Sequence, residues 1–427
     1  MKQLFPLATL WVLLCLLTSC ASRVSADQKD ALAQQESVTV QTSVGPLELP
    51  SPYSTPSAVK QSQIVDWPAG RTPQAPEGFT VSRYADGLQH PRSTYISPDG
   101  ETFVVESNTR NSANRILRLI DTDGDGRVDD RQVFADQLNQ PFGMLQLDGY
   151  FYIANTDAVW RYPYTEGQQR LDQATGERIL ATPPQGYNNH WTRNLLAAAD
   201  GSKIYVSVGS GSNVGENGME AETNRATILE IAPDGSGMRE YATGLRNPVG
   251  MDWNPVTGDL WTAVNERDKL GDGLVPDYAT SVQEGGFYGW PYSYYGGLPD
   301  PRWADDPHTV LTAQAIVPDV PLGAHTASLG LVFYTEDAFP AKYRNGAFIG
   351  QHGSWNRSKF AGYKVVFIPF DANGQPQPAE DFLTGFIADA DAGKVWGRPV
   401  GVSQTPAGDL LVCDDDAGII WRVSTAK

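Results

Sequence analysis

The chain has 427 residues, with 32 basic and 50 acidic side chains and a formal net charge of −18. So large a negative charge repels nucleic acids and anionic lipid surfaces, which argues against either as a partner. Because the sequence holds 3 cysteines in all, burial of apolar side chains rather than a disulfide framework must hold the fold together.

The N-terminus has the features of a bacterial lipoprotein export signal. Lys2 is followed by an apolar stretch over residues 4–17 and by small residues before Cys20, and such segments are cleaved rather than folded. The tetrapeptide Leu-Thr-Ser-Cys that ends at Cys20 fits a lipobox, which predicts a signal peptide at 1–19 and a lipid on Cys20. Ordinary secretion is the alternative. We expect a protein of the bacterial cell envelope, anchored on the periplasmic side of the outer membrane.

A flexible tether is predicted between the lipid and the folded domain. Residues 20–77 are rich in Ser, Gln, Thr, Val and Pro, a composition that buries too little apolar surface to order itself fully. Tyr53 and Trp67 are apolar anchors through which its later part can lie against the domain. No later apolar run reaches the ~18 residues of a membrane span, so we expect the lipid to be the only membrane attachment.

From residue 78 onward the chain repeats itself. Segments 85–91, 135–141 and 242–248 share one template, with Ala at the first position, Leu at the fourth and Pro at the last. Tight turns lie before β-rich runs, and their glycines are Gly100, Gly149, Gly201, Gly258, Gly346 and Gly408.

Repeats of about 50 residues with roughly four strands each are typical of propeller blades. Six turns predict an all-β fold, a six-bladed β-propeller with four-stranded antiparallel blades over residues 78–427. The one long interval must hold an insertion, which we place at 266–325. Amphipathic helical segments, which a solenoid or an α/β fold would need, are not visible.

Two loops carry residues suited to chemistry in the central channel of a propeller. His190, one of 5 histidines, stands in a polar loop before a predicted strand, where a neutral imidazole could take a proton from a substrate hydroxyl. A histidine buried between blades is the alternative. Arg246 and Asn247 offer a guanidinium beside an amide, a pair suited to carboxylate and carbonyl oxygens, or to a salt bridge between blades.

Arg357 and Arg398 each stand near a Trp at a predicted junction of loop and strand. With Arg246 they could converge from three blades on one flat, polyanionic ligand. The sequence has no dinucleotide glycine fingerprint, phosphate loop or haem attachment motif, so a redox role would need another cofactor.

Two acidic loops are candidate calcium sites. Residues 265–278, which include Glu266 and Arg267, offer many oxygen ligands in a glycine-rich loop, although a solvated loop would look similar. Residues 121–129 begin like an EF-hand loop, but Gln132 stands where the bidentate Glu belongs and the flanks look like strands. A plain acidic turn is the alternative there.

Several of these motifs together resemble the L-sorbosone and pyranose dehydrogenase branch of the soluble PQQ-dependent sugar dehydrogenases, over about residues 78–425. The motifs are the loop around His190 and residues 245–248, 265–268, 285–291, 325–330 and 352–357. The resemblance implies a six-bladed propeller with pyrroloquinoline quinone (PQQ) on top, bound partly through Ca²⁺. It implies oxidation of an aldose or a sorbosone-type sugar by hydride transfer from C1 to the quinone.

The resemblance also implies roles for individual residues. His190 would be the general base, Arg246 would polarise the accepting quinone carbonyl, and Asn247 would hold the cofactor's edge. Calcium would be reached mainly by backbone carbonyls near Glu266 and Arg267, as a Lewis acid on the cofactor.

The remaining cofactor contacts would be Arg398, paired with a cofactor carboxylate, Gln140, and from the fifth blade either Arg357 or Lys359. Without the fused cytochrome of some relatives, electrons would pass to a separate acceptor, a cytochrome or a quinone. The principal rival function is a metal-dependent hydrolase of the lactonase type, which would need a Glu/Asn/Asp metal cluster in the channel. The other rival is a lipoprotein whose propeller binds a ligand without catalysis.

Overall fold

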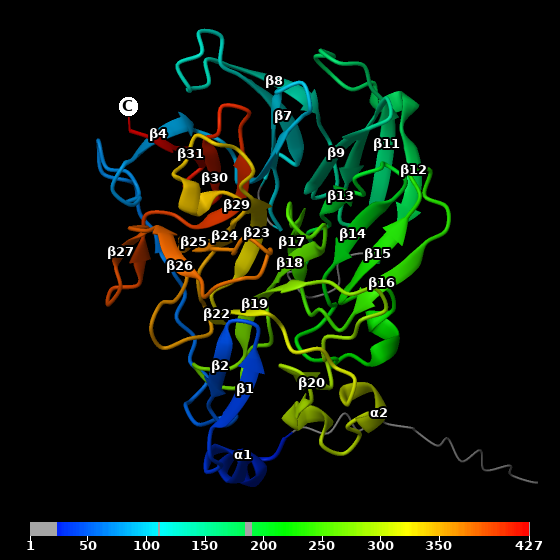
Figure 1. Ribbon diagram of the computed structural model, residues 1–427, viewed down its shortest axis with the longest axis vertical. Coiled ribbons are helices and arrows are strands. Elements are labelled where there is room, and N and C mark those ends of the chain that lie inside the picture. Colours follow the sequence, from blue (N-terminus) through cyan, green and yellow to red (C-terminus); the bar gives the residue numbers. More distant parts are fainter. Residues whose placement is uncertain (1–23, 110–111, 184–189, 427) are drawn as a thin grey trace, which may run out of the picture.

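The computed structural model describes residues 24–109, 112–183 and 190–426. The predicted signal peptide at 1–19 and the lipidated Cys20 lie outside these residues. Within them the fold is built almost wholly of strands, which form a ring of sheets around a central axis (Figure 1). No helix in this part of the chain combines the length and apolar character needed to cross a bilayer.

Six of the sheets in the described part have four antiparallel strands, and in five of them the strands follow one another in chain order. The first three sheets are β5 (Pro91–Ile96), β6 (Thr102–Glu106), β7 (Arg115–Ile120) and β8 (Asp130–Ala135); β9 (Gly143–Leu147), β10 (Tyr150–Ala154), β11 (Ala158–Pro163) and β12 (Glu177–Ala181); and β13 (Leu195–Ala197), β14 (Ile204–Val208), β15 (Thr227–Ile231) and β16 (Arg239–Thr243). The next two are β17 (Pro248–Trp253), β18 (Leu260–Val264), β19 (Pro276–Ser281) and β22 (Val320–Ala324); and β23 (Ser328–Phe333), β24 (Ala347–Gln351), β25 (Lys364–Ile368) and β26 (Glu380–Leu383).

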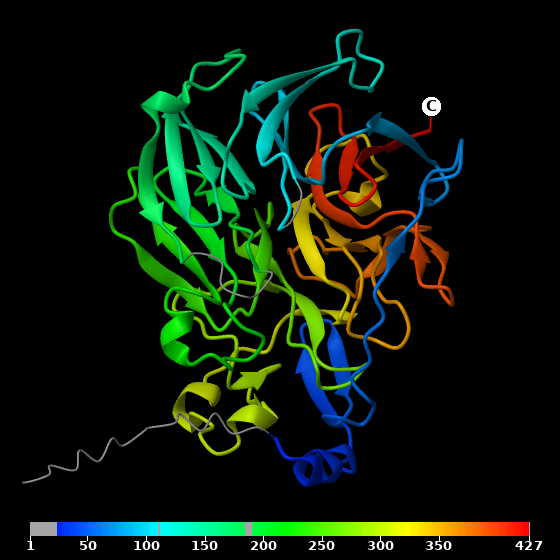
Figure 2. The same cartoon turned by 180° about the vertical axis from the view of Figure 1, so that it is seen from behind.

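The sixth sheet joins the two ends of the chain. It holds β29 (Pro399–Gln404), β30 (Leu410–Asp414) and β31 (Ile419–Thr425), and its fourth strand is β4 (Phe79–Ala85) from the start of the repeats. β4 runs antiparallel to β31 from the pair Phe79 and Thr425 onward, and Figure 2 shows it beside the C-terminus. Backbone hydrogen bonds thus close the ring.

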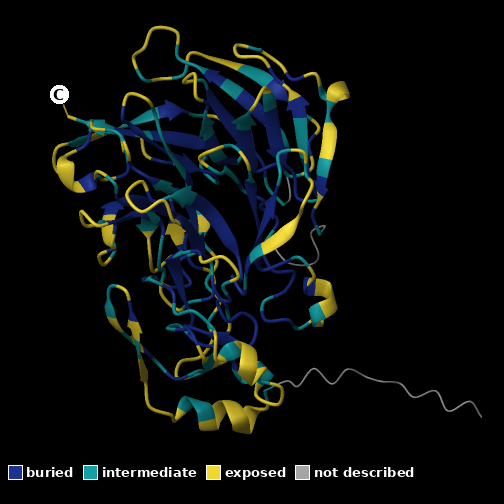
Figure 3. Cartoon of the chain, turned by 45° about the vertical axis from the view of Figure 1, so that its right-hand side comes forward, coloured by how far each residue is buried: buried dark blue, intermediate teal, exposed yellow. Residues whose placement is uncertain are grey.

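The first strands line the axis and contact one another in a closed cycle: β5, β9, β13, β17, β23, β29 and β5 again. Glycines allow this close approach, since a Cβ at Gly401 would lie 2.6 Å from the carbonyl oxygen of Arg92. One apolar core cluster comes from these strands and the segments that lead into them, and its members are Phe142, Trp191, Val249, Leu329 and Val400. Larger apolar clusters fill the space between neighbouring sheets, where the strands are almost wholly buried (Figure 3).

Equivalent loops of all six sheets meet at one face of the ring. Because every sheet repeats the same antiparallel order, its first strand begins where its second strand ends. Contacts link these ends from each sheet to the next, among them Gln140 to Asn108 and Arg398 to His352. We call this end of the molecule the site face, defined by the loops that precede the first strands and the loops that join the second strands to the third.

Residues 24–77 are packed against the ring, whereas the sequence predicts a flexible tether. They contain α1 (Ala26–Ala33), the hairpin of β1 (Val38–Thr42) and β2 (Gly45–Leu49), and β3 (Gln63–Ile64). β3 joins β27 (Ile387–Asp389) and β28 (Lys394–Val395) in a small sheet. Hydrogen bonds to the backbone of the ring supply the order that composition does not predict. The expected anchors are confirmed, since Trp67 is buried in the core and Tyr53 packs on another cluster.

The insertion lies between the third and fourth strands of the fourth sheet, inside the range predicted for it. It contains β20 (Ser293–Tyr294), β21 (Leu298–Pro299) and α2 (Thr309–Thr312). Short 3-10 turns occupy Gln173–Thr175, Met219–Glu222, Pro301–Trp303 and Ala341–Tyr343. Trp290 and Trp303 of the insertion donate their indole N–H groups to the carbonyls of Asn213 and Val214, so the insertion reaches back to the site face.

Candidate functional site

Four of the predicted site positions directly precede a first strand, and the topology therefore places all four on the site face. They are Gln140 before β9, His190 before β13, Arg246 with Asn247 before β17, and Arg398 before β29. Glu266, Arg267 and Arg357 lie on loops between second and third strands, which end at the same face. The sequence prediction that these side chains share one face agrees with this topology.

His190 is held as a neutral imidazole of defined tautomer. Its Nδ1 lies 3.1 Å from the hydroxyl oxygen of Ser210, which itself donates to the carbonyl of Ser212 at 2.6 Å. Because the serine proton is used there, Nδ1 of His190 donates, and the basic lone pair belongs to Nε2. Burial, followed by the positive charge of Arg246, lowers the pKa of His190 well below its ordinary value. The ring is therefore uncharged near neutral pH.

Asn247 lies against His190, and the backbone at Gly209 makes room for both. A Cβ at Gly209 would lie 2.7 Å from the Cβ of His190 and would collide with the amide oxygen of Asn247. That oxygen is buried, and within the described residues no hydrogen bond reaches it. An acceptor left without a partner beside a basic imidazole is what a site prepared for a ligand donor would contain.

Arg246 is buried, and all five of its N–H groups have oxygen partners within the protein. Nε and one N–H of Nη2 donate to the carbonyl and the side-chain oxygen of Asn213, at 3.0 and 2.9 Å. Nη1 donates to the carbonyls of Asn265 and Glu266 at 3.2 and 2.6 Å, and Nη2 also reaches the carboxylate of Asp268 at 3.3 Å. The guanidinium therefore has no spare donor for a quinone carbonyl, unlike its predicted role.

The loop that carries Glu266 and Arg267 is held by buried polar contacts. The Glu266 amide donates to Asp277, and burial raises the pKa of the Glu266 carboxyl to about 7. The Arg267 side chain forms an ion pair with Asp300. The backbone carbonyl of Arg267 accepts the amide N–H of Val275 at 3.2 Å. Since the Glu266 carbonyl accepts from Arg246, both carbonyls predicted to bind calcium already have protein donors.

His325 belongs to this network, although the sequence assigns it no role. Its Nδ1 lies 3.2 Å from the Asp268 carboxylate and its Nε2 lies 2.8 Å from the carbonyl of Gly271. Both partners are acceptors, so both ring nitrogens must carry protons. Burial alone would raise the pKa of Asp268, but the hydrogen bond from His325 and the charge of Arg246 outweigh it and keep that pKa low. Only spatial proximity reveals this pair, because 57 residues separate the two in sequence.

Arg398 and His352 meet where the fifth and sixth sheets join. Arg398 donates to the carbonyls of His352 and Gly353 at 3.0 and 3.3 Å and to Asp416 at 3.3 Å. His352 donates from Nε2 to Asp415 at 2.9 Å. Burial would raise the pKa of Asp415, but its contact with His352 and the charge of Arg92 outweigh burial and hold that pKa well below its usual range.

The three remaining residues predicted to contact the cofactor, Arg357, Lys359 and Gln140, have different surroundings. Arg357 donates to the carbonyl of Ala324 at 3.0 Å and forms no ion pair within the described residues, while Lys359 is exposed. Gln140 donates to the carbonyl of Asn108 at 3.1 Å, on the side of the site face formed by the first two sheets. No contact of the described residues joins Gln140 to His190.

Two groups of three potential metal ligands among His, Cys, Asp and Glu occur in the described ranges, and one of them lies on the site face. Asp121, Asp123 and Asp129 form one, on a loop between third and fourth strands at the opposite face from His190. The backbone N–H groups of that loop already occupy Asp121. The other is His90 with Asp415 and Asp416, which are already paired with arginines.

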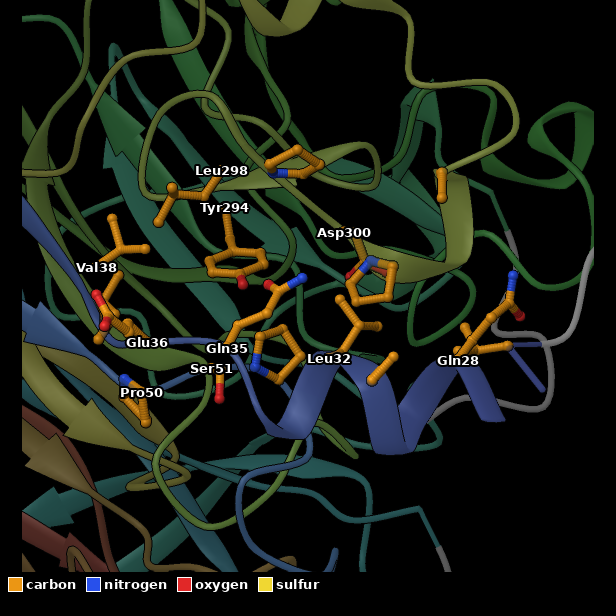
Figure 4. A pocket seen from close by; sticks show the side chains of 17 residues that line it. Gln28, Leu32, Gln35, Glu36, Val38, Pro50, Ser51, Tyr294, Leu298 and Asp300 are labelled. Atoms are coloured by element: carbon orange, nitrogen blue, oxygen red, sulfur yellow. The ribbon is translucent and has the colours of Figure 1, made fainter. Parts of the chain in front are cut away.

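A cavity of about 470 Å³ lies at the edge of the ring rather than at the axis. In Figure 4, α1 with Leu32 and Gln35 forms one wall, and Tyr294 and Leu298 of the insertion face it. Asp300 lines the cavity and pairs with Arg267. Pro50, which also lines the cavity, lies against Gly273, and Leu49 beside it packs in one apolar cluster with Leu270 of the same loop.

Comparison with known proteins places the fold. An uncharacterized protein of Borreliella burgdorferi is 28% identical over 369 residues, which are 83% of this chain and 92% of that protein. A pyrroloquinoline quinone-dependent sugar dehydrogenase of Hypocrea jecorina is 24% identical, over 84% of this chain and 90% of its own. A PQQ-dependent pyranose dehydrogenase of Coprinopsis cinerea is 24% identical over 81% of this chain, which spans about half (54%) of that protein.

Solved structures agree. The calcium structure of a Trichoderma reesei protein of carbohydrate-active enzyme family AA12 has a TM-score of 0.70 at 21% identity and covers 83% of this chain and 97% of its own. The holo form of the PQQ domain of Coprinopsis cinerea pyranose dehydrogenase has a TM-score of 0.68 at 20% identity and covers 86% of this chain and 100% of its own. At these identities the likeness shows the fold alone, a β-propeller. The homologues of the chain include soluble PQQ-dependent sugar and pyranose dehydrogenases, as its motifs predict. The chain belongs to the family described as a domain of unknown function, DUF7133, whose model matches residues 71–422.

Proposed function

We propose that this protein is a PQQ-dependent dehydrogenase that oxidises an aldose or a sorbosone-type sugar at C1. The observation that carries the proposal is the neutral, half-buried His190, whose basic lone pair is on Nε2, beside Arg246 and Asn247 on the site face. The named homologues, which are PQQ-dependent sugar and pyranose dehydrogenases, support it.

We further propose that the fold is a six-bladed propeller. Six four-stranded sheets in the described residues, and a closed cycle of contacts among their six first strands, support this count. The apolar cluster among these strands occupies the axis, so a ligand would approach His190 from the site face rather than through the channel.

In the proposed reaction His190 acts as the general base. Its Nε2 would accept the proton of the C1 hydroxyl, while the bond to Ser210 keeps Nδ1 protonated and the ring oriented. Bound PQQ would supply the acceptor for the hydride that leaves C1. Arg246 would keep His190 neutral through its charge, a different role from the predicted contact with the quinone carbonyl. Electrons would leave to a separate acceptor, a cytochrome or a quinone.

The side chains of the site face fit a flat, carboxylate-bearing cofactor. Arg357 has no ion-pair partner in the described part of the chain, and Arg398 uses three of its five N–H groups there. Both guanidiniums could therefore bind ligand carboxylates. The buried amide oxygen of Asn247, which lacks a described partner, would accept from a ligand N–H.

The loop of Glu266 and Arg267 fits a calcium ion less well than the site face fits the cofactor. The carbonyls expected to bind it accept N–H groups of Arg246 and Val275, so an ion there would have to displace or share these bonds. The proposal therefore routes no step through calcium.

We also propose that Cys20 is acylated and holds the protein in the cell envelope, on the periplasmic side of the outer membrane. The lipobox supports this proposal. Metabolic labelling with a palmitate analogue should mark the wild-type chain in a bacterial host and leave Cys20→Ala unlabelled. Equal labelling of both would end the proposal.

The decisive experiment uses the chain from residue 24 onward, because residues 24–77 are packed on the ring. The apo protein is mixed with PQQ, with and without Ca²⁺, and reduction of an artificial dye is followed over a panel of aldoses and sorbosone. Dye reduction should require PQQ. Equal activity without PQQ, or cleavage of lactones and esters instead, would refute the function.

Variants assign the base. His190→Ala should abolish turnover while leaving PQQ affinity within roughly tenfold, about 1.4 kcal/mol. His308→Ala, at a histidine on the insertion beside Tyr292, is the matched control and should keep its activity. If the protein binds sugar and PQQ but neither form turns over, it is a binding propeller.

A further inference from the structure

Five oxygen atoms surround the guanidinium of Arg246 in one buried cage. They are the carbonyl and the side-chain oxygen of Asn213, the carbonyls of Asn265 and Glu266, and a carboxylate oxygen of Asp268, at 2.6 to 3.3 Å from the donor nitrogens. The cage joins the loop after β14 to the loop after β18. Arg246 itself is 3% exposed.

The same set of oxygens is what a hard cation takes from a protein. Calcium binds backbone and amide carbonyls together with carboxylates, with six to eight oxygens in all. Here a planar cation with five donors fills the centre, and each oxygen receives one N–H of Arg246. The loop thus has a cation, but the cation is a side chain.

Other hydrogen bonds within the protein hold the oxygens of the cage in place. Asn213 receives the amide of Asp268 at 2.9 Å on the side-chain oxygen that also faces Arg246. Its carbonyl receives the indole N–H of Trp290 at 2.9 Å. On the far side His325 holds the second carboxylate oxygen of Asp268. Each of these contacts aims an oxygen at the place that Arg246 occupies.

We propose that Arg246 is a built-in cation which takes the place of a metal ion in this cage, so that the loop of Glu266 and Arg267 is organised without calcium. The charge that lies beside His190 is then covalently part of the chain and does not depend on the supply of metal. This inference concerns the cage alone and stands whether or not the protein oxidises sugars.

The experiment opens the cage and asks whether metal enters. Terbium(III) serves as the calcium probe, because the Trp290 indole lies against the cage and can sensitise its luminescence. Arg246→Ala should gain Trp-sensitised terbium luminescence that calcium competes away, and the wild-type chain from residue 24 should lack it. In the same variant, calcium at 100 times its dissociation constant should raise the unfolding temperature by roughly 3 °C, while wild type stays unchanged.

Two further variants assign the signal. Arg246→Ala with Asp268→Asn removes the carboxylate of the cage and should lose the terbium response. Arg246→Lys keeps a cation in the cage and should remain insensitive to calcium, which keeps the idea testable if Arg246→Ala does not fold. A wild-type terbium signal that Trp290→Phe removes would overturn the proposal. So would an Arg246→Ala protein that folds but binds no terbium.

Discussion

Truncation of Trp67 tests whether the N-terminal segment is part of the folded unit. Its ring packs against Phe386, Trp396 and Trp421, with centroid distances of 5.0 to 5.7 Å, and its indole N–H donates to Asp414 at 3.2 Å. Loss of a buried tryptophan costs about 3–5 kcal/mol of unfolding free energy. Asp414 would keep the indole of Trp421 as a donor, so no further cost arises from an unsatisfied carboxyl.

Urea unfolding of the chain from residue 24 measures the effect. Trp67→Ala should lose about 3–5 kcal/mol, and Trp67→Phe, which keeps a ring but loses the N–H, about 1–2 kcal/mol. Val59→Ala is the matched control in the same segment, since Val59 is 65% exposed and its loss should change stability by less than about 0.5 kcal/mol. If Trp67→Ala shifts stability by less than about 1 kcal/mol, the segment behaves as a tether and the packing argument fails.

Three further predictions concern the site face. On the acid side, the turnover rate should fall with an apparent pKa below the ordinary histidine value. Arg246→Gln should raise that pKa, because it removes the cation beside His190. Rate measurements between pH 4 and 8 would show both effects. Asp415→Asn should cost about 3–5 kcal/mol near neutral pH by leaving Arg92 unpaired. Because the folded-state pKa of Asp415 is depressed, its contribution is lost as pH falls below about 4, so wild type and variant should converge in acid denaturant titrations. Gly209→Ala should cost about 1–3 kcal/mol by collision with His190 and Asn247 and should sharply lower turnover. Gly297→Ala, whose Cβ would lie 3.4 Å from its nearest neighbour, is the control for both assays.

The sequence predicts the ring well because its signals are local and repeated. The glycine turns recur once per sheet and the Leu-x-x-Pro template recurs three times, and in five of the six sheets the strands follow one another in chain order. The order of residues 24–77 is not predicted, because it depends on hydrogen bonds to distant strand edges. The pairing of β3 with β28 joins positions more than 300 residues apart, and no composition rule reveals such a contact.

The site is predicted in part for the same reason. A position before a first strand can be read from the repeat, so His190, Arg246 and Arg398 are found. What each side chain contacts cannot be read in this way. Arg246 looks available for a ligand in the sequence, but five oxygens from two other loops use all of its donors. The motifs include Asp268 and His325, but the sequence does not predict that the two form a pair, because their loops meet only in the fold.

The packed N-terminal segment changes what a lipid on Cys20 would mean. A free tether over residues 20–77 could reach roughly 200 Å at about 3.5 Å per residue. Since the described fold begins at Val24, four peptide units separate it from Cys20, and they span at most about 14 Å. Acylation of Cys20 would therefore hold the domain at the bilayer surface. The segment that carries the proposed anchor is also bonded to the site face, where Tyr53 donates its amide to the carbonyl of Leu270 at 2.7 Å. A lipid on Cys20 would therefore be carried by the same N-terminal segment that is hydrogen-bonded to the loop around Arg246.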